Sequence, residues 1–277
     1  FFQAEDGIRD LVRSRWLGDV YKRQAQWGVL DFAGGIVVHA SAGMAALASV
    51  FYVGKRSIAE RGPHSIPLVA LGTGLLWFGW YGFNAGSELQ VDAITGIAFL
   101  NTDIAASFAA ITWLILAWTL EKKPKFVGLL TGAVAGLATI TPAAGFITVQ
   151  SAAIIGIIAG IVCYFAVSLK NKMQWDDALD VWGVHGVGGS IGVILLGLFA
   201  TNAVNPMVTT NGLLMGGGYE FLFKQVVTVL AVCVYAFIFS YVMLWLINFV
   251  TPVKVTKEEE EAGLDSSLHG EMAYEQD

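Results

Sequence analysis

The chain has 277 residues, of which 56% are hydrophobic and only 14% charged, and its formal net charge is −6. Soluble domains contain about 45–50% apolar and about 25% charged residues, so this composition excludes an ordinary soluble domain. The charges gather in the two ends and the short loops, which excludes the basic surface typical of nucleic-acid binding. We therefore predict an integral protein of a lipid bilayer.

Residues 1–24, "FFQAEDGIRDLVRSRWLGDVYKRQ", differ from the rest of the chain. They carry five basic and four acidic residues and lack the uninterrupted apolar stretch of a membrane span or a signal peptide. The strings "FFQAEDGIRD" and "VYKRQ" resemble translated sequencing adapter. We therefore expect residues 1–24 to be an artefact and the native protein to begin upstream of the sequence shown.

Residues 25–253 contain a series of long apolar runs. About 20 helical residues cross the hydrocarbon core of a bilayer, and helices satisfy their own backbone hydrogen bonds there. Seven runs meet this length, and the alternation expected of barrel strands is absent from them. The predicted helical spans are Phe32–Val53, Ile66–Ala85, Ile94–Leu120, Phe126–Phe146, Ala152–Leu169, Val181–Phe199 and Val226–Val250.

Lysine and arginine predict the orientation of these spans. Basic residues mark cytoplasmic loops, and in this chain they occupy alternate loops. The other loops hold Glu88, Asp92 and Glu220, and their only basic residue is Lys224. We therefore expect a multi-pass protein of the cell membrane with a cytoplasmic C-terminus. Residues 254–277 are polar and acidic, which predicts a solvated tail. The basic loop residues are Lys55, Arg56, Arg61, Lys122, Lys123, Lys125, Lys170, Lys172, Lys254 and Lys257.

Two histidines lie inside predicted spans, where ionisable groups are costly and usually functional. His39 follows Asp31 in a span that runs inward, and His185 follows Asp180 in a span that runs outward. This arrangement is typical of an inverted repeat. Glycine and serine flank both histidines and allow the two helices to approach, so the imidazoles can meet and share a proton. The alternative is that each histidine makes an ordinary hydrogen bond between helices.

Three other features of the spans carry predictions. Trp80, Phe83 and Ser87 share one helix face near the outer end of a span, which suits a small cation held by cation-π attraction. The alternative is the aromatic belt found at membrane interfaces. Asp103 faces either a water-filled cavity or an adjacent subunit. Cys163 and Cys233 lie in apolar runs and predict buried thiols rather than a disulfide or a metal site, and no cofactor is expected.

Four motifs together resemble the ammonium transporter family, which includes the yeast Mep and animal Rh proteins. They are "DFAGGIVVHASAG", "GWYGFNAGS", "DDALDVWGVHGVGG" and "GLDSSLHGEMAY", and the resemblance covers about residues 26–275. It implies a homotrimer with one pore in each subunit. It also implies that this all-α chain holds the C-terminal seven helices of an eleven-helix inverted-repeat fold, with four spans missing.

The resemblance assigns roles to individual residues. His39, His185 and Phe83 match the pore, Ser87, Trp80 and Asp31 match the outer vestibule, and Asp177 and Asp180 match acids at the inner mouth. The tail matches a regulatory segment that couples subunits and in many bacteria docks a PII-type signal protein. Its matching residues are Gly263, Leu264, Asp265, His269 and Gly270.

The function implied is ammonium transport. Ammonium binds at the vestibule and loses its proton, and ammonia crosses the apolar pore because it avoids the desolvation cost of an ion. Two alternatives stay open: an ammonium sensor on the same fold, and a membrane cytochrome in which the two histidines ligate a haem.

Overall fold

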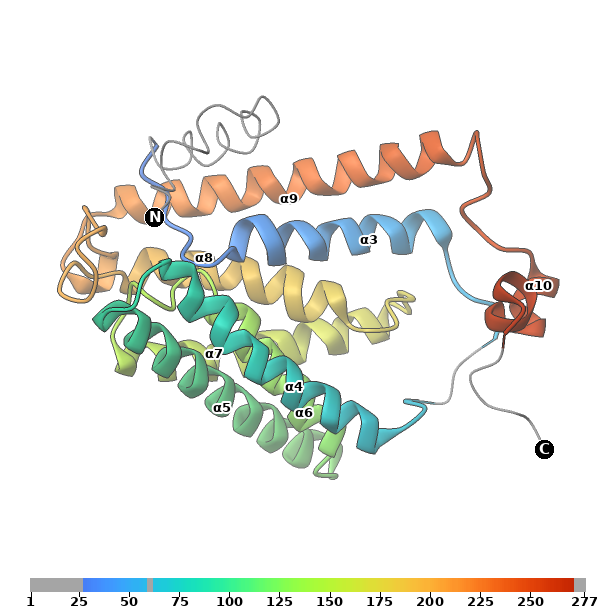
Figure 1. Cartoon of the computed structure of the whole chain (residues 1–277), viewed down its shortest axis with the longest axis horizontal. Helices are drawn as coiled ribbons and strands as arrows, with labels where there is room; N and C mark the ends of the chain where they lie inside the picture. Colours follow the sequence, from blue (N-terminus) through green and yellow to red (C-terminus); the bar gives the residue numbers. More distant parts are fainter. Residues whose placement is uncertain (1–26, 59–61, 272–277) are drawn as a thin grey trace.

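The computed structural model describes residues 27–58 and 62–271. Within this part of the chain the regular structure is entirely helical, which confirms the predicted all-α membrane architecture. The helices run roughly along one direction, with α3 and α9 side by side (Figure 1). Residues 1–24, which we expect not to be native, lie outside the described residues.

Six helical segments of the described residues are apolar and long enough to cross a bilayer. Two of them begin with a π-helical segment: η1 (Gly35–Ala40) continues into α3 (Ser41–Val53), and η3 (Trp182–Gly186) continues into α8 (Val187–Phe199). The other four are α4 (Ile66–Ala85) with the short η2 (Gly86–Glu88), α5 (Ala93–Glu121), α7 (Val149–Lys172) and α9 (Tyr219–Ile247).

The remaining predicted span is shorter than expected. The apolar run suggested a helix over Phe126–Phe146, but α6 (Phe126–Ile140) ends six residues earlier. Pro142 has no backbone N–H and cannot continue the helical hydrogen bonding. Residues 141–146 form turns instead, with hydrogen bonds from the Ala143 and Phe146 amides to the Ile140 and Ala143 carbonyls. This break places a buried turn beside η1, where the Phe32 and Ala33 amides donate to it.

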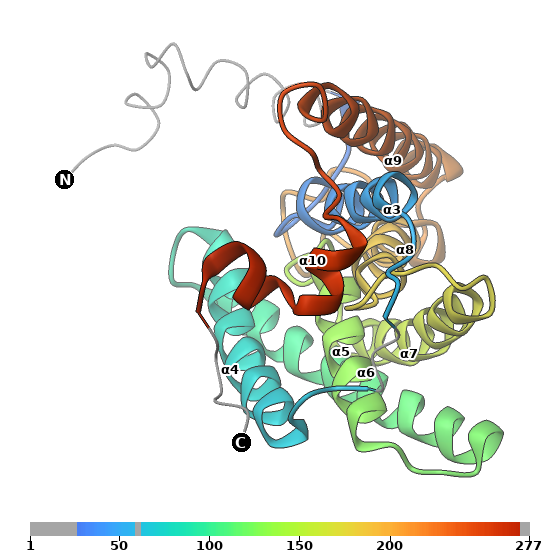
Figure 2. The same ribbon diagram turned by 90° about the vertical axis from the view of Figure 1, so that its right-hand side faces the viewer.

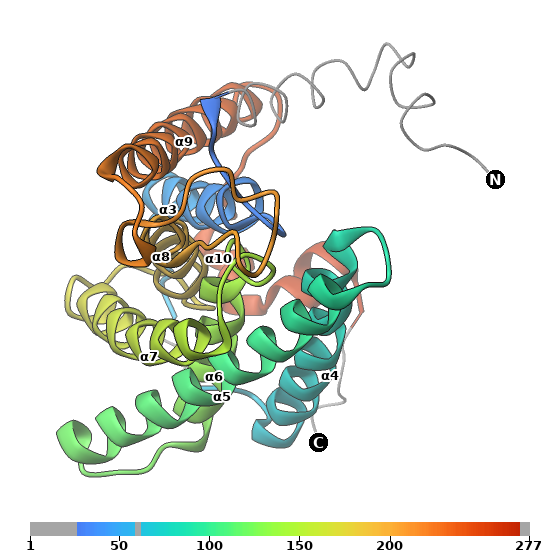
Figure 3. The same ribbon diagram turned by 90° about the vertical axis from the view of Figure 1, so that its left-hand side faces the viewer.

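Small residues hold α5, α6 and α7 together as a compact block. A Cβ atom added at Gly136 of α6 or at Gly156 of α7 would lie 2.5 Å from the Ala105 carbonyl oxygen of α5. Backbones approach this closely only where side chains are absent, as is typical of helices packed in membranes. The block lies on one side of α3 and α8, with α9 on the other, as the end view of Figure 3 shows.

The basic loops all lie at one end of the bundle, which we call the basic end; the other is the acidic end. The chain leaves α9 at the basic end and forms α10 (Lys257–Ala262) and η5 (Asp265–His269). Figure 2 shows this tail lying across the basic end of the bundle. The lateral faces of α4 and α9 are apolar and exposed, as expected of a lipid-facing surface: Phe78 is 76% and Val234 58% exposed.

Candidate functional site

The two membrane histidines meet where the segments that carry them cross. Nδ1 of His185 lies 3.2 Å from Nδ1 of His39, and their ring centroids are 5.3 Å apart. Both residues lie in π-helical segments, a rare geometry that occurs frequently at functional sites. His39 is buried, with 4% of its surface exposed. The structure therefore brings together two residues that lie 146 positions apart in the sequence.

Glycines make this meeting possible. A Cβ atom at Gly43 of α3 would lie only 2.1 Å from the Cα atom of Gly186, and one at Gly189 of α8 would lie 2.6 Å from Cβ of His39. The helices therefore cross backbone to backbone. The small residues around each histidine in the sequence are what allow the two backbones to come this close.

A carboxylate accepts the first backbone amides of each histidine segment; we call η1 the His39 segment and η3 the His185 segment. Asp31 accepts hydrogen bonds from the amides of Gly34, Gly35 and Ile36 at 3.2, 2.6 and 2.8 Å. Asp177 accepts hydrogen bonds from the amides of Val181 and Trp182 at 3.1 and 2.8 Å. In both segments the carboxylate precedes the histidine by eight residues.

Asp177 is thus the symmetric counterpart of Asp31, which corrects the expected pairing of Asp31 with Asp180. Asp180 instead forms an ion pair with the buried Lys170, at 2.6 Å. Burial raises the pKa of Asp31 to about 6, although its amide hydrogen bonds act in the opposite direction. Burial also raises the pKa of Asp180, with Lys170 opposing that shift.

Aromatic rings cover His39 on the side of α4. Trp80 stacks on His39 with centroids 5.2 Å apart, and Phe83 lies 6.0 Å from His39 and 5.6 Å from Trp80. Trp80 is buried, so it does not occupy the exposed position of an interfacial belt residue. The Ser87 hydroxyl donates to the Phe83 carbonyl at 2.8 Å, one turn beyond Phe83.

Thr141 is a site residue that the sequence analysis missed. It lies at the end of α6, and its hydroxyl oxygen is 3.3 Å from Nε2 of His39 and 3.0 Å from Nε1 of Trp80. The same hydroxyl donates to the Leu137 carbonyl at 2.8 Å. The signal in the sequence was the Thr–Pro pair that interrupts an apolar run.

Comparison with known proteins places this arrangement in a family. The sequence profile described as Ammonium Transporter Family matches residues 16–274. The chain belongs to the ammonium transporter family. It is 44% identical over 272 residues to the ammonium transporter of Bacillus subtilis, with 94% of this chain and 67% of that relative covered. It is 41% identical to the ammonium transporter Amt1 of Archaeoglobus fulgidus, with 95% and 70% covered.

Solved structures of the ammonium transporter family share the fold. The crystal structure of Candida albicans Mep2 has a TM-score of 0.78 and 37% identity, covering 86% of this chain and 55% of that one. A structure named Sensor Amt Protein has a TM-score of 0.80 and 32% identity, covering 89% and 62%. The chain thus spans about two thirds of the length of the Bacillus subtilis and Archaeoglobus fulgidus relatives and little more than half that of the Mep2 structure.

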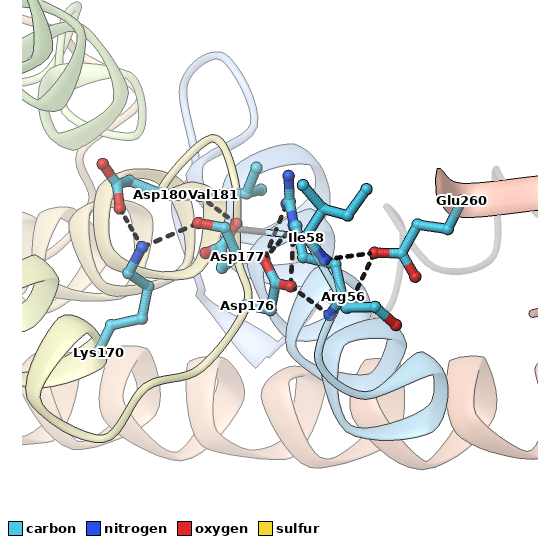
Figure 4. Close-up of polar contacts among 9 residues, drawn as sticks. Arg56, Ile58, Lys170, Asp176, Asp177, Asp180, Val181 and Glu260 are labelled. Atoms are coloured by element: carbon cyan, nitrogen blue, oxygen red, sulfur yellow. Dashed lines mark hydrogen bonds and ion pairs between the residues drawn. The ribbon is translucent and has the colours of Figure 1, made fainter. Parts of the chain in front are cut away.

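At the basic end, Asp177 and Asp180 line a cavity of about 1070 Å³ between α4, α6 and the loop from α7 to α8. Lys170 donates to the Asp177 carbonyl at 2.8 Å while it pairs with Asp180. Next to them, Asp176 accepts from both the side chain and the backbone amide of Arg56 (Figure 4). The start of the His185 segment is therefore fixed by several charged contacts.

The tail reaches this region through Glu260. One carboxylate oxygen of Glu260 accepts from the amides of Ser57 and Ile58 at 2.5 and 3.1 Å, in the loop that also carries Arg56 (Figure 4). The tail motif residues Gly263, Leu264 and Asp265 line a second cavity of about 1000 Å³ against the end of α3. The remaining two residues, His269 and Gly270, are exposed.

Asp103 makes a contact that the sequence did not predict. The Tyr81 hydroxyl of α4 donates to Asp103 of α5 at 2.5 Å, and the Tyr81 ring stacks on Phe99 at 4.1 Å. Asp103 therefore links α5 to α4, a role that neither alternative from the sequence anticipated.

Proposed function

We propose that this chain forms the histidine-lined pore of an ammonium transporter. The observation that supports this proposal is the direct contact of His39 and His185 inside a tight, apolar helix crossing. Ammonium is recruited beside Ser87, Phe83 and Trp80 at the acidic end and loses its proton near Asp31. Ammonia then passes the imidazoles towards Asp177 and Asp180.

The physical basis for selectivity is the cost of desolvation. A permanent cation such as potassium would enter the apolar segment without its water, at a cost of several kcal/mol or more. Ammonium can leave its proton outside and cross as a neutral molecule that hydrogen-bonds to imidazole nitrogens. The two imidazoles supply donors and acceptors along the path without adding a fixed charge.

The surroundings of the pore belong to the same proposal. We place the protein in the cell membrane with the basic end in the cytoplasm, because basic residues mark that side. The tail is then a cytoplasmic regulatory segment at the inner mouth. A homotrimer and a PII-type signal protein at the tail are the partners that family membership suggests.

A sensor is the second candidate function, favoured by the similarity to the Sensor Amt Protein structure. A sensor binds ammonium and changes conformation without sustained flux. A haem protein is disfavoured by geometry, since two ring nitrogens 3.2 Å apart leave no room for a porphyrin between them.

Flux and binding measured on one preparation separate transporter from sensor. The protein expressed from its native gene is reconstituted in lipid vesicles and given an ammonium gradient. Transport predicts saturable ammonium flux that an equal potassium gradient does not reproduce. Tight ammonium binding with no flux above that of empty vesicles would establish the sensor function instead.

We expect ammonium flux to fall on acidification, with a midpoint near pH 6. Because the pKa of Asp31 is raised to about 6, about nine-tenths of this carboxyl is ionised at pH 7 and about one tenth at pH 5. Protonation weakens the acceptor for the Gly34, Gly35 and Ile36 amides and so loosens the start of the His39 segment. The measurement is initial flux at saturating ammonium, with equal pH on both sides of the membrane.

The matched variant for this test is Asp31→Asn, which keeps the shape of the side chain. It should transport slowly at every pH and lose the step near pH 6. Persistence of that step in Asp31→Asn would assign the titration to another group.

We expect Glu260→Gln to release the tail from the bundle. The Ile58 amide is the main reason that the pKa of Glu260 lies below its usual range, so the bond uses the ionised form. Docking is therefore strongest above the usual carboxyl pKa and is lost as pH falls through the lowered value. Hydrogen exchange at pH 7 should show faster exchange of the Ser57 and Ile58 amides in this variant.

Glu261→Gln is the matched control, because Glu261 lies on the same short helix and forms an ion pair with Lys257 one turn away. It should exchange like the unmodified protein. Equal exchange in the two variants would mean that Glu260 does not hold the tail.

A further inference from the structure

The contacts of the Thr141 hydroxyl determine which of its neighbours donates and which accepts in each hydrogen bond. A hydroxyl has one proton to donate and two lone pairs that accept. The Thr141 proton goes to the Leu137 carbonyl at 2.8 Å, the shortest of its three contacts. The Trp80 indole nitrogen, 3.0 Å away, can only donate. One lone pair of the Thr141 oxygen is therefore left to face Nε2 of His39.

This remaining lone pair determines the tautomer of His39. Nε2 of His39 lies 3.3 Å from the Thr141 oxygen and must carry a hydrogen for the contact to be favourable. In a neutral imidazole only one nitrogen carries hydrogen, so Nδ1 of His39 is then an acceptor. It faces Nδ1 of His185 at 3.2 Å, which must therefore be the donor.

We propose that Thr141 is a positioning residue that sets the proton order of the histidine pair. His39 holds its hydrogen on Nε2 and His185 holds its hydrogen on Nδ1, which leaves Nε2 of His185 as the acceptor nitrogen of the pair. An ammonia N–H has one defined place to donate, on the side of His185. Thr141 contacts His39 at Nε2 and acts through that residue.

The position of Thr141 supports this role. It is fully buried at the end of α6, and its backbone carbonyl accepts the Ala33 amide at 3.2 Å. The turn that holds Thr141 is thus tied to the loop that starts the His39 segment. In the other tautomer the unprotonated Nε2 of His39 would face a lone pair of the Thr141 oxygen, with no hydrogen between the two acceptors. Leaving buried acceptors unpaired is costly, so the contact favours the tautomer with hydrogen on Nε2.

Nitrogen-15 NMR of histidine-labelled protein in lipid tests this proposal, because protonated and unprotonated imidazole nitrogens resonate apart. The unmodified protein should show hydrogen on Nε2 of His39 and on Nδ1 of His185. Thr141→Val, which keeps the shape but removes the acceptor, should shift the His39 tautomer ratio about fivefold or more towards Nδ1–H. Thr141→Ser should preserve the original ratio.

Thr139→Val is the matched control, since Thr139 of α6 is as fully buried as Thr141, and the hydrogen-bonding neighbour of its hydroxyl is the Cys163 thiol rather than a histidine. It should leave both histidines unchanged. Hydrogen on Nδ1 of His39 in the unmodified protein, or an unchanged ratio in Thr141→Val, would overturn the proposal.

A flux measurement forms the second arm, and only this arm rests on the proposed function. Thr141→Val should lower the maximal ammonium flux, whereas Thr141→Ser, which keeps the hydroxyl, should preserve it. The two measurements test different claims. Absence of flux in the unmodified protein would contradict the proposed transport function, whereas the tautomer assignment depends on the spectra alone.

Discussion

His185→Ala is expected to reduce ammonium flux by about 100-fold or more, a loss typical of removing a group that handles protons. The substitution deletes the partner of His39 Nδ1 at 3.2 Å and the acceptor nitrogen that we assign to His185. The vacated space lies in an apolar crossing, where a water-filled gap would also admit other ions. Flux of ammonium and of potassium into vesicles measures both effects.

His64→Ala is the control for histidine loss, because His64 is exposed in the loop between α3 and α4. It should transport at close to the unmodified rate. Undiminished ammonium selectivity in His185→Ala would end the proposal that the histidine pair forms the pore. A fall in potassium exclusion without a fall in ammonium flux would show that the pair acts as a barrier only.

Gly43→Val is expected to prevent stable folding. A Cβ atom at this position would overlap the Gly186 backbone, at 2.1 Å from its Cα atom and 2.3 Å from its nitrogen. Backbone cannot move aside as a flexible side chain can, and overpacking of this kind costs about 1–3 kcal/mol or more. Thermal unfolding in detergent should show a markedly lower midpoint, or no folded protein at all.

Gly79→Val on α4 is the matched control, since a Cβ atom there has open space around it. Its unfolding midpoint should stay close to that of the unmodified protein. Equal midpoints for the two variants would mean that α3 and α8 separate easily, and the tight crossing would lose its structural importance.

Much of the fold follows from local sequence. Apolar length predicts the spans because a bilayer imposes a minimum number of helical residues. The end of α6 was missed because hydropathy does not distinguish a helix from a buried turn. Pro142 was the available sign, and its effect depends on backbone hydrogen bonding rather than on polarity.

The candidate site was less accessible to sequence reasoning. Composition and spacing single out His39 and His185, but their contact spans 146 positions and depends on the crossing at Gly43 and Gly186. The sequence paired Asp180 with Asp31 because both lie just before a span. The hydrogen bonds instead assign that place to Asp177, three residues earlier. Thr141 is ordinary in type, and only its three neighbours give it a role.

The two carboxylates at the starts of the histidine segments have an electrostatic consequence. The segments run in opposite directions, so one helix N-terminus faces each end of the bundle (Figure 1). The aligned peptide dipoles give an N-terminus about half a positive charge, which attracts anions such as chloride or phosphate. Asp31 and Asp177 occupy these two positions themselves. Neither N-terminus is therefore open to a free anion, and this holds whichever way nitrogen moves along the pathway.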